Sequence, residues 1–352
     1  MDRPLIIPIF IPYQGCPRRC IYCNEHIAAG SPQPPPTAAA LKRQILASRH
    51  RTRRHPPRIE IAFYGGTFTG LDREAQAALL APATACLREG LVQGIRISTR
   101  PDEIDDDEVQ FLRTAGVWTV EIGAQSLVDA VLEKSRRGYT AEDVVRTVTR
   151  LKTKGFATGL HLMIGLPGED GAAFAETVRR AVALRPDMVR LHPTLVFRET
   201  ELADLYRAGA YEPLSLEDAL AACRQALRAF EGAGIPVIRL GVQTTPEMEA
   251  PGVVLAGPYH PALRSRVEES IAGEMAARLL AGLPVRGQTV LFTATPTLAA
   301  HLKGRKKAQL GTLQEDFDLA GVEVAVDPAS PGDVLALTVG DRTARTGRWG
   351  PL

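Results

Sequence analysis

The stretch PLIIPIFIPYQGCPRRCIYCNEH, residues 4–26, joins an apolar run to three cysteines that are separated by three residues and then by two. We predict a buried β-strand over residues 5–11, because the run is short and rich in isoleucine. A secretory or lipoprotein leader would also be apolar, but Pro4, Pro8 and Pro12 interrupt the run and no basic segment of any length precedes it. The sequence therefore favours a strand and a cytoplasmic location, where thiols stay reduced.

The same succession of apolar run and amphipathic stretch is repeated along most of the chain. The further runs that we predict as strands span residues 59–64, 94–99, 117–122, 157–164, 187–192 and 236–241. Between them, stretches such as 37–50, 72–89 and 140–155 carry apolar residues at intervals of three and four, which is typical of amphipathic helices. This alternation predicts an α/β fold, a partial (βα)6-type TIM-like barrel, in which functional residues gather where strands end.

A length of 352 residues suggests about two domains. We predict residues 1–245 as the barrel domain and residues 246–352 as a small C-terminal α/β domain of unknown role. The segment TTPEMEAPG, residues 244–252, resembles a linker, and after it come a helical stretch at 262–281 and two strand candidates, QTVLFTA and GVEVAVD. The proline-rich SPQPPP, residues 31–36, is interpreted as a stiff loop.

The net charge of +2 is too small to indicate nucleic-acid binding by itself. Two local basic segments leave RNA contact open: one lies at 302–307, and the other contains Lys42, Arg43, Arg49, Arg51, Arg53, Arg54 and Arg58. No run approaches the roughly 18 apolar residues that a membrane span needs. We therefore expect a globular protein that does not cross a membrane.

The three clustered cysteines indicate a metal site. Soft thiolate ligands favour zinc or an iron–sulfur cluster. Cys16, Cys20, Cys23 and His26 could form a closed zinc site, although structural zinc sites usually use two separated ligand pairs and the chain has no second pair. Alternatively, three cysteines on a four-iron cubane leave one iron free to bind a small molecule. The remaining cysteines, Cys86 and Cys223, lie among alanines in helical patterns and are expected in the core.

The segment CPRRCIYC resembles the signature of the radical S-adenosylmethionine enzymes. Further motifs follow in the order seen in the catalytic subunit of the elongator complex and its bacterial relatives: FYGGTFTGLD, ISTRPDEI, VEIGAQSLVDAVLEKSRRGYT, HLMIGLPGE and RLHPTLVFRETELADLYRAGAYEPLSLED. The resemblance covers about residues 7–245. It implies that Cys16, Cys20 and Cys23 bind a [4Fe-4S] cluster and that the fourth iron binds S-adenosylmethionine.

The resemblance also implies a set of contacts to S-adenosylmethionine. These are Tyr22, Gly65, Gly66, Thr67, Ser98, Glu121, Gln125, Arg137, His161, Gly165 and Pro167. Arg137 follows Gln125 at the spacing of the coproporphyrinogen branch, in which an arginine pairs with the methionine carboxylate. Two positions depart from these relatives, since Ser98 stands where the elongator subunit has a glutamate and His161 stands where the coproporphyrinogen branch has an aspartate.

The substrate is not indicated by any motif. The resemblance and the basic segments favour tRNA, and a small metabolite is the alternative. We expect an electron donor such as flavodoxin or ferredoxin. We expect no use of acetyl-CoA, because the last hundred residues carry no glycine motif for its pyrophosphate. Two other hypotheses are a zinc-stabilised, non-catalytic binding module and a family member that holds the cluster without turnover.

Overall fold

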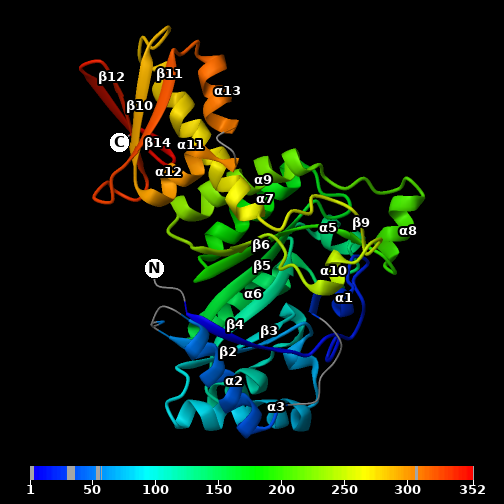
Figure 1. The fold of residues 1–352 in the computed structure, drawn as a ribbon. Helices are drawn as coiled ribbons and strands as arrows, with labels where there is room; N and C mark the ends of the chain where they lie inside the picture. Colours follow the sequence, from blue (N-terminus) through cyan, green and yellow to red (C-terminus); the bar gives the residue numbers. More distant parts are fainter. Residues whose placement is uncertain (1–3, 30–35, 53–55, 57, 306–307, 352) are drawn as a thin grey trace. The chain divides into compact units, whose positions relative to one another are not determined.

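The computed structural model describes residues 4–29, 36–52, 56, 58–305 and 308–351. The chain forms two compact units, Met1–Pro261 and Ala262–Leu352 (Figure 1). Residues 31–35 of the predicted proline-rich loop lie outside the described residues, as do Arg53, Arg54, Lys306 and Lys307 of the basic segments. Of the helices in the described ranges, none combines the length and the hydropathy that a membrane span requires.

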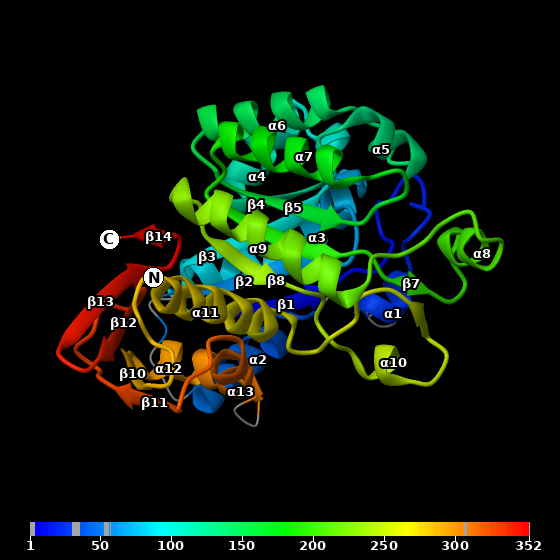
Figure 2. The same cartoon turned by 90° about the horizontal axis from the view of Figure 1, so that it is seen from above.

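Seven parallel strands form a curled, open half-barrel in the first unit (Figure 2). The strands are β1 (Leu5–Phe10), β2 (Ile59–Tyr64), β3 (Gly94–Thr99), β4 (Val117–Gln125), β5 (Ala157–Ile164), β6 (Met188–Pro193) and β8 (Val237–Leu240). They lie side by side in chain order, with β1 and β8 at the edges of the sheet. The predicted partial barrel is thereby confirmed. Its strands match the predicted runs to within one residue at each end, except that β4 continues three residues further, to Gln125.

Helices pack against the outer face of this sheet (Figure 2). The helices of the first unit are α1 (Glu25–Ala29), α2 (Ala38–Arg51), α3 (Arg73–Arg88), α4 (Asp106–Thr114), α5 (Asp129–Lys134), α6 (Ala141–Thr153), α7 (Gly171–Leu184), α8 (Glu201–Arg207), α9 (Leu216–Gly232) and α10 (Pro246–Glu249), with 3-10 turns at Phe68–Gly70 and Pro101–Glu103. Side chains define their starts: the Asp72 carboxylate accepts the Ala75 N–H at 2.8 Å, and Thr140 and Asp143 form a capping box.

The two faces of the sheet differ sharply in polarity. Alternate residues such as Ile61, Phe63, Ile95, Ile97, Val120, Ile122, Leu160 and Leu162 face the helices and are at most 1% exposed. The other set faces the interior of the half-barrel and includes Glu60, Tyr64, Arg96, Glu121, His161 and Arg190. A parallel sheet covered on one side thus leaves a polar inner face for ligands.

Glu121 is the centre of an ion network on this inner face. Its carboxylate lies 2.6 Å from Arg96 Nη1 and 2.5 Å from Arg190 Nε, and Arg96 Nη2 also reaches Glu60 at 2.6 Å. Burial alone would raise the pKa of Glu121, but the Arg190 and Arg96 guanidinium groups hold it below its usual range. The network therefore joins β2, β3, β4 and β6 through charged side chains.

The segment predicted as a linker is instead folded onto the first unit. Met248 of α10 is 3% exposed and belongs to an apolar cluster with Ile27 and Leu195. The Thr245 hydroxyl donates to the Ile27 carbonyl at 2.7 Å. Shortly after, β9 (Val254–Ala256) pairs with β7 (Val196–Phe197). The linker prediction failed because Met248 is a single apolar residue, too little to show a helical period in the sequence.

The second unit contains a five-stranded mixed sheet and three helices. Its helices are α11 (Leu263–Ala281), α12 (Pro296–Lys303) and α13 (Ala308–Asp316), and its strands are β10 (Thr289–Ala294), β11 (Gly321–Val326), β12 (Val334–Val339), β13 (Arg342–Gly347) and β14 (Gly350–Pro351). The strand order is β11-β10-β12-β13-β14. The predicted helix and the two predicted strands are present, whereas β12 and β13 were not predicted.

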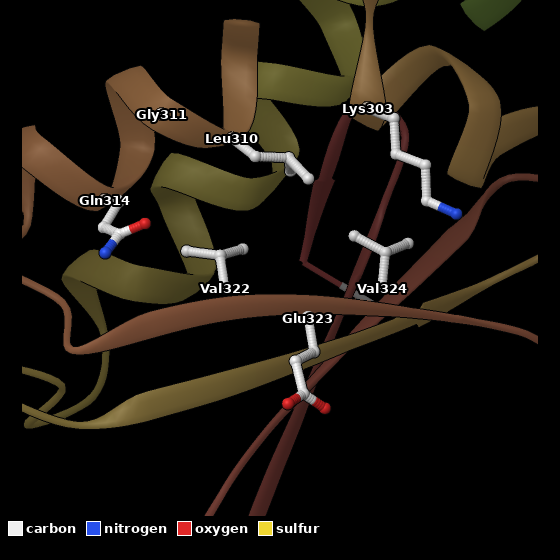
Figure 3. A pocket seen from close by; sticks show the side chains of 7 residues that line it. All are labelled: Lys303, Leu310, Gly311, Gln314, Val322, Glu323 and Val324. Carbon is white, nitrogen blue, oxygen red and sulfur yellow. The ribbon is translucent and has the colours of Figure 1, made fainter. Parts of the chain in front are cut away.

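A depression on the second unit lies between β11 and the helices α12 and α13 (Figure 3). Val322 and Val324 point into it toward Leu310, whereas Glu323 points to the opposite side of the strand (Figure 3). Lys303 and Gln314 line its rim. Among its described lining residues there is no nucleophile paired with a base, so this depression offers no catalytic arrangement.

We predict that Glu121→Gln destabilises the protein strongly. The substitution leaves Arg96 and Arg190 with an uncompensated charge in a buried network, a change that typically costs about 3–5 kcal/mol. Urea unfolding of the purified variant measures the free energy of unfolding. Glu176→Gln removes one partner of an exposed pair with Arg179 and serves as the control, with no measurable change expected. Equal stability of both variants would contradict a structural role for this network.

Candidate functional site

The three predicted metal ligands lie on one loop directly after β1. All three cysteines are free thiols, and the loop is closed by backbone hydrogen bonds from Cys16 N to Tyr13 O at 3.2 Å and from Cys23 N to Cys20 O at 3.0 Å. Gly15 has φ of +71°, and a Cβ at this position would lie 2.0 Å from the Thr67 carbonyl oxygen. Only glycine fits here, so the loop that follows β2 determines the path of the cysteine loop.

The Gly65-Gly66-Thr67 loop follows β2 and packs against the cysteine loop. A Cβ on Gly66 would lie 2.5 Å from the carbonyl oxygens of Ile11 and Gln14. Thr67 donates its N–H to Gln14 O at 2.9 Å, and its hydroxyl lies 3.3 Å from Cys16 Sγ. The Gly65 carbonyl accepts the Tyr13 N–H at 2.9 Å. These three residues therefore position the first cysteine, and a contact to a ligand remains a prediction for them.

Arg137 reaches the cysteine loop from the other side of the site. Its guanidinium is buried, and Nη1 lies 2.7 Å from Cys20 Sγ and 3.3 Å from the Tyr22 hydroxyl. Nη2 donates to the Gly123 carbonyl at 2.8 Å. The sequence prediction that named Arg137, Tyr22 and the cysteines thus selected side chains that lie together.

Two unpredicted residues hold Arg137 in place. The Tyr139 hydroxyl accepts from Arg137 Nε at 2.6 Å and lies 3.0 Å from Gln125 Oε1. Arg100 Nη2 donates to the Arg137 carbonyl at 2.6 Å, and Arg100 is itself held by Asp102, which accepts from its Nε and Nη2. Tyr139 lies only two residues after Arg137 in the sequence, so it could have been identified among the polar residues that adjoin Arg137.

The end of β4 departs from regular strand geometry. A register shift occurs between Gly123 and Gln125, and Gln125 has φ of 57°. The alternation of side chains between the two faces of the strand is therefore interrupted between Glu121 and Gln125. Gln125 lies beside Tyr139, whereas Glu121 is committed to the arginines of the inner face.

His161 lies on the inner face beside a second histidine. The rings of His161 and His192 meet edge to face, with their centroids 4.3 Å apart. Burial and the nearby Arg190 lower the pKa of His161 to about 4, so its ring is neutral at physiological pH. Its Nε2 has no hydrogen-bond partner among the described residues. Ser98 is next to Glu121 in the register of β3 and β4.

Gly165 and Pro167 lie in the turn that follows β5. The Gly165 N–H is bound by Glu169 Oε2 at 2.7 Å, and its carbonyl accepts the Tyr211 hydroxyl at 2.6 Å. Burial raises the pKa of Glu169 to about 7. Gly165 has φ of +78°. Leu166 of this turn belongs to the same apolar cluster as Cys20, Ile21 and Tyr22, so the turn packs toward the cysteine loop.

Three cysteine thiols on one loop are the donor type that suits zinc or an iron–sulfur cluster. Among the described residues, no three His, Cys, Asp or Glu side chains converge closely enough to hold one metal ion. A cubane binds each thiolate to a different iron, so its three sulfurs do not need to meet at one point. His26, the fourth ligand of the zinc alternative, is exposed and packs its ring edge against Tyr13, with centroids 4.9 Å apart.

One carboxyl group that the sequence analysis missed lies beside the thiols. Glu25 Oε1 is 3.5 Å from Cys23 Sγ, and burial raises the pKa of Glu25 to about 7. Burial, followed by the neighbouring Glu25, in turn raises the pKa of the Cys23 thiol. In the sequence, Glu25 could have been identified as a neighbour of the thiols by its position two residues after the last cysteine of the group.

Comparison with known proteins agrees with this geometry. Residues 10–181 match the family model of the radical SAM superfamily, and residues 186–273 match the radical SAM C-terminal domain. The chain is 29% identical over 187 residues to the tRNA uridine(34) acetyltransferase of Methanocaldococcus jannaschii, which covers 47% of this chain and 35% of the relative. It is 36% identical over 129 residues to Elongator complex protein 3 of Homo sapiens, covering 36% of this chain and 23% of the relative.

The fold also resembles a solved structure. The archaeal Elp3 of Methanocaldococcus infernus superposes with a TM-score of 0.55 at 23% identity, over 66% of this chain and 59% of that chain. The chain spans about a third of the length of the Methanocaldococcus jannaschii relative, 35%. The matched models begin at the end of β1 and extend across the whole half-barrel. The chain belongs to the radical S-adenosylmethionine (radical SAM) superfamily of enzymes.

Proposed function

We propose that this chain holds a [4Fe-4S] cluster on Cys16, Cys20 and Cys23 and cleaves S-adenosylmethionine reductively to activate a substrate. The observation that carries the proposal is the buried Arg137 guanidinium, 2.7 Å from Cys20 Sγ. Its partners Gly123 O and the Tyr139 hydroxyl are neutral, and no described carboxylate pairs with it, so an anionic group bound there would balance its buried charge. A cluster with its thiolates and the carboxylate of S-adenosylmethionine would supply that negative charge.

When bound, the cluster supplies the electron that splits S-adenosylmethionine into methionine and a 5′-deoxyadenosyl radical. The residues of the chain bind, orient and shield the reactants. Arg137 would hold the methionine carboxylate through its two-pronged guanidinium, and Tyr139 and Arg100 fix the orientation of that group. Tyr22, which is 9% exposed, covers one side of the cysteine loop against water.

Other residues would bind the rest of the S-adenosylmethionine molecule. Gln125 and the neutral His161 would contact its hydroxyl and amino groups, with Ser98 nearby. The loops at Gly65–Thr67 and Gly165–Pro167 would shape the site through their backbones. Of the predicted contacts to S-adenosylmethionine, the one to Glu121 has the least support, because the Glu121 oxygens already accept hydrogen bonds from Arg96, Arg190 and Tyr64.

A tRNA is the substrate that the relatives favour, and a small metabolite is the second candidate. The Methanocaldococcus jannaschii relative is described as a tRNA uridine(34) acetyltransferase. In support, α2 carries the described basic residues Lys42 and Arg43 in its second turn and Arg49 and Arg51 in its last turn. We infer that the residues present do not bind acetyl-CoA. We also infer that flavodoxin or ferredoxin donates the electron and that the enzyme acts in the cytoplasm.

The first test concerns Arg137. We expect Arg137→Lys to lower 5′-deoxyadenosine formation by about tenfold or more at low S-adenosylmethionine concentration, because lysine cannot bind a carboxylate in the two-pronged manner. Product is measured by chromatography after incubation with reductant, and iron content is measured in the same samples. Arg136→Lys is the matched control, since Arg136 is exposed and pairs with Glu201 on the surface. Equal loss in both variants at full iron content would argue against this role of Arg137.

The second test separates the cluster from the zinc alternative. We expect Cys20→Ser to abolish the brown iron–sulfur absorption of anaerobically purified protein, because serine is a poor ligand for iron in such clusters. His26→Ala should keep full iron content, and so should Cys86→Ala on α3. Metal analysis that found zinc in the wild type, and its loss in His26→Ala, would favour the non-catalytic module instead.

The third test concerns the tRNA candidate. If tRNA binds through the basic residues of α2, its affinity should fall steeply with salt, because bound phosphates release counterions. Filter binding or anisotropy over a range of potassium chloride concentrations measures the slope. Replacing Lys42, Arg43 and Arg49 together by glutamine should weaken binding and reduce that slope. An undetectable or salt-insensitive interaction would leave the small metabolite as the substrate class.

A further inference from the structure

The inner face of the half-barrel carries more positive than negative charge. Its described charged groups are Arg58, Arg96, Arg190 and Arg239 against Glu60 and Glu121, with Tyr64, His161 and His192 as the other titratable neighbours. Glu60 is shared by Arg58 and Arg96, and Glu121 is shared by Arg96 and Arg190. Among the residues that the structure describes, neither carboxylate, nor any other, forms an ion pair with Arg239.

Arg239 also lies directly beside another arginine. It is the register partner of Arg190 on the neighbouring strands β8 and β6. Like charges at adjacent positions of a sheet destabilise it. Arg190 is neutralised by Glu121 at 2.5 Å, whereas the only hydrogen bond of Arg239 within the described residues runs from Nε to the Gly241 carbonyl at 3.4 Å. Burial, followed by the charge of Arg190, lowers the pKa of Arg239, which reflects the missing counter-charge.

Two histidines leave ring nitrogens without partners on the same face. His192 follows Arg190 by two residues on β6, and His161 is the register partner of Arg190 on β5. The Nε2 atoms of both rings are buried and unpartnered among the described residues. A buried polar group without a partner is destabilising. Burial, followed by the positive neighbours, lowers the pKa of His192, so its ring is neutral and can donate one N–H.

These observations share one explanation. We propose that Arg239 and His192 form a binding site for an oxyanion of the substrate, a phosphate or a carboxylate group, on the inner face of the half-barrel. The inference rests on the proposed function, since it assigns the substrate of the same site. The oxyanion supplies the counter-charge of Arg239 and accepts the N–H of His192. Arg137 lies at the cysteine loop, so the two arginines serve different anions.

The test measures oxyanion binding to the full-length, cluster-loaded protein. Thermal unfolding is followed in sodium phosphate and in sodium acetate, each against sodium chloride of equal ionic strength. A ligand that binds only the folded state raises the midpoint in a concentration-dependent way. We expect at least one of the two anions to do so. A response to phosphate alone assigns a phosphate group, and a response to acetate assigns a carboxylate.

Arg239→Gln should weaken the apparent affinity for that anion by about tenfold or more, because it removes the charged donor. His192→Phe should weaken it as well, and it keeps the test valid if Arg239→Gln does not fold. Arg88→Gln, at the exposed end of α3, is the control and should bind as the wild type does. Wild-type affinity in both Arg239→Gln and His192→Phe overturns the inference, as does the absence of any anion effect on the wild type.

A separate measurement distinguishes this failure from failure of the proposed function. The same wild-type preparation is assayed for 5′-deoxyadenosine with reductant and S-adenosylmethionine. Product together with unchanged anion binding in the variants removes only the oxyanion site. Absence of product at full iron content removes the proposed function, while the anion titration still reports on Arg239 and His192.

Discussion

The period-two alternation of seven parallel strands is the constraint on which the rest of the structure depends. Helices cover one face of the sheet, so every second residue must be apolar, as at Ile61, Phe63, Ile95 and Ile97. The other face does not pack against these helices, so it can carry charged residues, whose charges are partly neutralised in the ion network around Glu121. A site for polar ligands therefore follows from covering the sheet on one side only.

Close backbone contacts then bring the loops at the strand ends together. Gly15 and Gly66 allow the loops after β1 and β2 to approach within distances that a Cβ would prevent. Arg137 adds a third element, since its guanidinium joins the end of β4 to the cysteine loop through Gly123 O and Cys20 Sγ. Thr67 thus contacts Cys16 from one side, and Arg137 contacts Cys20 from the other. These contacts hold the loop in one conformation, so they determine where the three thiols lie.

Much of this arrangement could be predicted because its signals are local in the sequence. Buried strands read as short apolar runs, and the cysteine spacing and Arg137 belong to motifs. The unpredicted parts depend on contacts between distant residues. Arg239 and His192 look like ordinary polar positions of alternating strands, and only the pairing of β6 with β8 shows that Arg239 adjoins Arg190. Residues 244–252 were predicted as a linker, since Met248 packs against Ile27 and Leu195, which are far away in sequence and give no local pattern.

The charges of the inner face also explain why the polar residues of one strand differ in role. Glu121 and Gln125 both lie on β4, but Glu121 is saturated by Arg96, Arg190 and Tyr64. A carboxylate with these partners holds the sheet together and has little capacity left for a ligand. Gln125, displaced by the bulge, keeps its amide beside Tyr139 and Arg137. We therefore propose that the loop end of β4 contacts S-adenosylmethionine, whereas Glu121 in the middle of the strand contributes to the stability of the half-barrel.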